Sequence, residues 1–140
     1  MTQLIQKFLE VMTHEEHSES EIVKHTVSYG LGAFAYALPP EAFQPFLAQS
    51  VTLIKGVTMR DEAFSPENME ATENAMGALA KIAYKHMDGT NVTAQDLAGV
   101  FSFFPFKSDE CECQCTHGYF IEQIANSASP VHTAEIKPAA

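Results

Sequence analysis

The segment Gly32-Ala33-Phe34-Ala35 recurs 45 residues later as Gly77-Ala78-Leu79-Ala80, and this pair decides the predicted fold. A further step of 45 residues reaches Glu122-Gln123-Ile124-Ala125. HEAT-type helical repeats have a period of roughly 40–47 residues. Glycine inside a helix costs about 1 kcal/mol against alanine, so its presence indicates a packing reason. We therefore expect neighbouring helices to approach closely at these small residues.

Apolar residues recur at helical spacing along nearly the whole chain, and no run alternates as a half-buried strand would. The pattern predicts six helices, separated by a polar break at 14–18, by Pro39-Pro40, by an acidic loop, by Asp88-Gly89 and by Pro105. Their expected ranges are 2–13, 19–38, 41–57, 65–87, 93–104 and 109–127.

Two helix starts carry specific signals. Ser65-Pro66-Glu67 reads as a capping residue, a proline at the first helical position and a first-turn acid. Thr93 belongs to the sequon Asn91-Val92-Thr93, and its hydroxyl is expected to cap the following helix rather than to mark a glycosylation site.

Three helix pairs at a constant interval predict an all-α fold, a right-handed α-solenoid of about three HEAT repeats. The expected repeats are 1–38, 39–88 and 89–130 in a single domain, followed by a short tail at 131–140. Each repeat of a solenoid buries its apolar side against its neighbours. We therefore expect exposed apolar faces at the first and sixth helices, which the tail or self-association would cover.

Composition restricts the function. The 140 residues hold 8 Lys+Arg against 18 Asp+Glu, a formal net charge of -10, and no apolar run approaches a membrane span of about 20 residues. Such a charge repels nucleic acid and anionic membranes and favours a basic partner. The charged N-terminus does not read as a secretory signal, and three crowded cysteines fit a reducing compartment, so an intracellular protein is expected.

Several segments are similar to one known family. Tyr29-Gly30-Leu31-Gly32, Phe46 with Leu47, and Ala71-Thr72-Glu73-Asn74-Ala75 resemble late HEAT repeats of importin-beta-type nuclear transport receptors (karyopherin beta). Phe101-Ser102-Phe103-Phe104-Pro105-Phe106 and the Ser-Pro linker at 127–131 look like the importin-five (karyopherin beta three) branch. The similarity spans about residues 22–131, and these receptors contain many more repeats than three.

The resemblance implies a protein that moves between cytoplasm and nucleus and wraps basic cargo with its inner helices. The similar repeats are late ones, so no contact with Ran is carried over. Relatives also dock Phe-Gly segments of nuclear pore proteins between outer helices. Four apolar residues occupy such helices here, although plain core packing is the favoured interpretation: Phe43, Phe46, Leu97 and Phe101.

Acidic residues cluster around two turns between paired helices. Surface charge of this kind is usually only solvation, but a pair of acidic ridges facing a basic cargo is the functional alternative. The first cluster is Glu15, Glu16, Glu19 and Glu21, and the second is Asp61, Glu62, Glu67, Glu70 and Glu73.

The sequence offers two patterns of metal-ligating residues and no cofactor motif. Cys111, Cys113, Cys115 and His117 could ligate zinc, but a helix would turn Cys113 nearly opposite Cys111 and Cys115, and no second pair completes a site. Structural or incidental cysteines are therefore the favoured interpretation.

The second pattern, His14-Glu15-Glu16-His17, lacks the i, i+4 histidines of a metalloprotease and is expected to be a solvated connection. No residue set supports an enzyme. The predicted function is a binding scaffold, with a HEAT scaffold outside transport and a small metal-binding helical protein as alternatives.

Overall fold

The computed structural model describes residues 1–86 and 92–125. Within these ranges it contains seven helices and no strand, which confirms the all-α class. The helices are α1 (Thr2–Thr13), α2 (Glu15–Ser18), α3 (Glu21–Ala37), α4 (Pro40–Met59), α5 (Met69–His86), α6 (Ala94–Ser102) and α7 (Glu110–Ala125).

Most helix boundaries match the sequence pattern. α1 has the expected bounds, and Thr93 caps α6: its hydroxyl accepts the Asp96 N–H at 3.2 Å, and the Asp96 carboxylate accepts the Thr93 N–H at 2.8 Å. α6 ends at Ser102, shortly before the expected Phe104. The expected stop at Asp88-Gly89, Asn91 of the sequon and the tail at 131–140 lie outside the described residues.

Two expectations about helix starts were wrong. The polar break at 14–18 contains the short helix α2, because the His14 carbonyl accepts the backbone N–H groups of His17 at 3.0 Å and Ser18 at 2.9 Å. α5 starts at Met69 and not at Ser65, because residues 61–68 form successive turns. Asn68 holds these turns, since its side chain donates to the Glu62 carbonyl at 3.1 Å and its backbone N–H to the Ser65 carbonyl at 3.1 Å.

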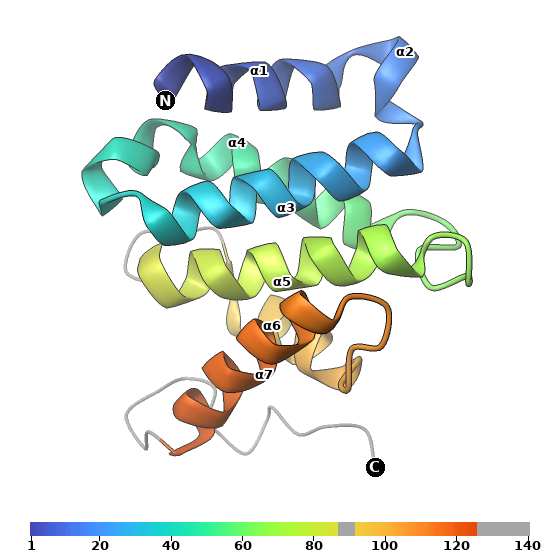
Figure 1. Ribbon diagram of the computed structural model, residues 1–140, viewed down its shortest axis with the longest axis vertical. Helices are drawn as coiled ribbons and strands as arrows, with labels where there is room; N and C mark the ends of the chain where they lie inside the picture. The colour runs from blue at the N-terminus through green and yellow to red at the C-terminus, as the bar shows by residue number, and fades with distance from the viewer. Residues whose placement is uncertain (87–91, 126–140) are drawn as a thin grey trace.

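The long helices α1, α3, α4 and α5 run across the view in Figure 1 and alternate in direction along the chain. α3, α5 and α7 follow one another as neighbours, because α5 contacts both α3 and α7. α1 contacts α3 and α4, and α5 contacts α4 and α6 as well. The connections from α1 to α3, from α4 to α5 and from α6 to α7 all lie at the same edge, the right side of Figure 1.

The centre of the fold is α5, whose residues 71–80 are all buried. Most of them have small or medium side chains, and four helices pack around them. The α3 and α5 backbones approach closely at Gly32 of α3, where an added Cβ would lie 2.8 Å from both Cα and Cβ of Ala78. The small-residue segments found in the sequence therefore meet each other at the α3/α5 interface.

Apolar side chains are exposed at α1 and its neighbour α3, as the sequence led us to expect for the first helix. Leu4, Val11 and Ile22 are exposed, Ile22 to 77%, and they border a shallow groove of about 290 Å³ between α1 and α3. At the other end of the described chain, Ile121 of α7 is exposed to 68%. What covers these faces stays a prediction.

Two helical glycines form a matched pair for a stability test. Gly32→Ala should destabilise the protein by about 1–3 kcal/mol, because the new methyl group would push the α5 backbone away. Gly56→Ala in α4 should be neutral or stabilising by up to about 1 kcal/mol, because nothing lies within 4 Å of its added Cβ. Denaturant unfolding of both variants measures the difference, and a Gly32→Ala protein as stable as Gly56→Ala would refute the close approach.

Candidate functional site

The connections that lead into α3, α5 and α7, with the first turns of these helices, contain many exposed acidic residues. All three connections lie at one edge of the molecule, and we call their exposed acids the acidic edge. Its members are Glu15, Glu16, Glu19, Asp61, Glu62, Glu67, Glu70 and Glu110.

Helix electrostatics explain why acids are tolerated here. Glu21, Glu70 and Glu110 stand in the first turns of α3, α5 and α7, where the helix dipole favours negative charge. Lys24 and Arg60 are engaged with Glu21, and the exposed Lys107 in the connection before α7 faces eight exposed acids. The edge therefore keeps an excess of negative charge.

Arg60 fixes the middle of the edge. Its guanidinium pairs with Glu21 of α3 and donates to Thr72 Oγ1 of α5 at 3.1 Å and to the Asn68 carbonyl at 3.3 Å. Burial alone would raise the pKa of Glu21, but the hydrogen bonds from Lys24 and Arg60 outweigh it and lower the pKa below its usual value. Glu21 is therefore a charged structural partner of Arg60 rather than a free acid of the edge.

Glu73 differs from the other predicted acids. The sequence placed it among residues facing a basic cargo, but the structure buries it to 4% exposure. Its carboxylate accepts the backbone N–H groups of Lys107 at 2.8 Å, Ser108 at 2.7 Å and Asp109 at 3.3 Å. Glu73 thus holds the connection into α7, and no spacing pattern in the sequence indicated this partner.

The apolar residues considered for Phe-Gly docking mostly belong to the core. Phe43 is fully buried with its ring 5.3 Å from the ring of His86, and Leu97 is exposed to only 1%. Phe101 is exposed to 7% and stacks on Phe120 at 5.3 Å, while Phe46 is half-buried. The packing alternative holds for Phe43, Leu97 and Phe101.

The cysteine cluster is divided by the helix, as its spacing predicted. Cys111 and Cys115 are exposed on α7, whereas half-buried Cys113 has its Sγ 3.3 Å from Nδ1 of His117. Nε2 of His117 accepts the Phe106 N–H at 3.2 Å. Among the described residues, these four side chains do not bring three ligand atoms together.

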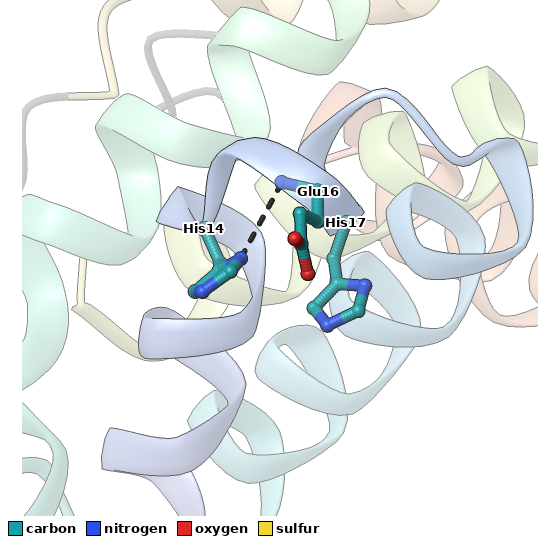
Figure 2. Close-up of side chains that lie close together, drawn as sticks. All are labelled: His14, Glu16 and His17. Atoms are coloured by element: carbon teal, nitrogen blue, oxygen red, sulfur yellow. Dashed lines mark hydrogen bonds between the residues drawn. The ribbon is translucent and has the colours of Figure 1, made fainter.

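Three ligand atoms do converge at the start of α2. One atom each from His14, Glu16 and His17 lies within 4.8 Å of the other two, and all three side chains are exposed. Figure 2 shows the two rings and the carboxylate extending from one short stretch of chain. The sequence analysis tested this segment only against the i, i+4 histidine pattern and therefore missed the convergence.

Sequence reasoning also missed a cavity of about 540 Å³ between α3, α5 and α7. Alanines at positions 33, 37 and 80 leave the space open, and Tyr36 and Tyr84 stack beside it with ring centroids 5.9 Å apart. Tyr119 also lines the cavity, and burial, with a smaller effect of Tyr84, raises its pKa to about 12. Runs of small residues in adjacent helices were the only available signal.

The α5/α7 contact beside this cavity depends on a second glycine. Glu112 of α7 is exposed to only 2% and pairs with Lys81 of α5. An added Cβ at Gly77 would clash with the Glu112 carboxylate. Glycine at position 77 therefore leaves the room that this buried ion pair needs.

A comparison with known protein families finds no family profile that matches the chain. None of the helices in the described ranges combines the length and apolarity needed to cross a bilayer.

Glu73 provides a test of the division between structural and exposed acids. Glu73→Gln should lower the free energy of unfolding by about 1–3 kcal/mol. The amide has no charge, and its NH₂ group replaces one of the two oxygens that accept the backbone N–H groups of Lys107 and Ser108. Glu70→Gln, on an exposed first-turn side chain of the same helix, should change it by less than about 1 kcal/mol. Equal effects in thermal and denaturant unfolding would contradict the assignment.

Proposed function

We propose that this chain is a protein-binding scaffold of HEAT type, and that a basic segment of a partner protein binds along its acidic edge. One observation carries the proposal: the connections into α3, α5 and α7, which contain the exposed acids, lie on the same side of the molecule. Charges spread over separate faces would not give one elongated partner a continuous field.

The solenoid arrangement is part of the proposal. The neighbour order α3, α5, α7 and the contact of α1 with α4 are consistent with stacked helix pairs. The 45-residue interval supports repeats at 1–38, 39–88 and 89–130, stacked as a right-handed α-solenoid. The resemblance to importin-beta-type receptors then favours a basic cargo and movement between cytoplasm and nucleus.

The scaffold acts by reversible recognition. Exposed ion pairs contribute about 0.2–1 kcal/mol each, so several acids must act together to hold a basic segment. Their range is limited by a Debye length of about 8 Å at physiological salt. Binding should therefore be fast to form, moderate in strength and sensitive to ionic strength.

The proposal gives no Phe-Gly docking role to Phe43, Leu97 or Phe101, because their side chains are buried. A HEAT scaffold outside nuclear transport remains the alternative. It differs in its partner, since it would bind no basic localisation peptide.

A matched pair of charge variants tests the acidic edge. In Glu62→Gln/Glu67→Gln, two exposed acids of the edge are neutralised, and the affinity for a fluorescent Lys/Arg-rich peptide should fall about threefold or more at low salt. In the control, Glu41→Gln/Glu122→Gln, the same number of exposed charges is removed at the start of α4 and on α7, and affinity should change less than twofold.

Fluorescence anisotropy over a range of salt concentrations measures both effects. Peptide binding should weaken steeply with salt in the unmodified chain. Binding that is absent, that is insensitive to salt, or that falls equally in both variants would overturn the proposal.

A further inference from the structure

The convergence of His14, Glu16 and His17 has a chemical use that the scaffold role does not require. We propose that these three side chains form a binding site for a divalent transition metal ion such as Zn²⁺. The inference is independent of partner binding, since it rests on ligand chemistry and geometry alone.

The donor set selects the class of ion. Two imidazole nitrogens and one carboxylate oxygen suit Zn²⁺, Ni²⁺ and Cu²⁺, whereas Ca²⁺ and Mg²⁺ prefer sites made only of oxygen. Three protein ligands leave further positions for water, as in open zinc sites. The exposed carboxylates of Glu15 and Glu19 next to the site raise the local concentration of cations.

The geometry needs only a small adjustment. Zinc at about 2.1 Å from each donor sets donors about 3.4 Å apart in a tetrahedral site. The three atoms now lie within 4.8 Å of one another, and the rings of His14 and His17 are already stacked, with centroids 5.1 Å apart. Because all three side chains are exposed, they can close this gap by side-chain rotation without moving the core.

Metal binding has one identifiable cost. Nδ1 of His14 accepts the Glu16 N–H at 3.4 Å. If the ion binds Nδ1, it uses the lone pair that accepts the Glu16 N–H. If the ion binds Nε2, the imidazole proton moves to Nδ1, and Nδ1 can no longer accept a hydrogen bond. Either way the bond is lost, but at 3.4 Å it is long and therefore weak. The backbone α-helical bonds of α2 do not depend on it.

Isothermal titration of the untagged full chain with Zn²⁺ tests the site. We expect one ion bound at this site, with the affinity reduced at least about tenfold in His17→Ala and lost in His14→Ala/His17→Ala. His25→Ala is the matched control, because His25 is a partly exposed histidine of α3 that joins no ligand group among the described residues. This variant should bind zinc as the unmodified chain does.

A second variant separates this site from the thiols. Cys111→Ser/Cys113→Ser/Cys115→Ser should keep the ion that the histidines bind, and amide NMR signals of residues 13–20 should shift when zinc is added. No binding at all, binding that survives loss of both histidines, or binding that disappears with the cysteines would each overturn the proposal. Unchanged far-UV circular dichroism of the histidine variants shows that loss of binding is not loss of fold.

Discussion

The close packing of α5 among its neighbours is the constraint on which the rest of the structure depends. Residues 71–80 are all buried, and α3, α4, α6 and α7 pack around this one helix. Such packing requires small side chains where the helices approach each other closely. Gly32 against Ala78 sets the spacing to α3, and Gly77 makes room for the Glu112–Lys81 pair with α7. Larger side chains at either point would separate the helices.

This packing also determines where charge can collect. Because the helices alternate in direction, the connections into α3, α5 and α7 share one edge (Figure 1). Glu21, Glu70 and Glu110 stand in the first helical turns that follow these connections. Two polar contacts hold the connections in place: Arg60 fixes the one before α5, and the Glu73 carboxylate fixes the one before α7. Buried polar groups thus position the exposed acids without belonging to their surface.

The all-α class and most helices could be predicted from the sequence, whereas the contacts of single residues could not. Helical periodicity, prolines and the Thr93 cap gave the helices, because these signals are local. Ser65-Pro66 misled because the turns before α5 are stabilised by contacts from Arg60 and Asn68 that no local pattern encodes. The burial of Glu73 and the convergence of His14, Glu16 and His17 were not predicted, because both depend on backbone geometry.

Native-state hydrogen exchange tests the central place of α5 most directly. If the other helices depend on it, amide protons of residues 71–82 should exchange only through global unfolding, and those of α1 and α7 should exchange faster through local opening. Measured exchange that is as fast in α5 as in α1, or slowest in a helix other than α5, would contradict the account.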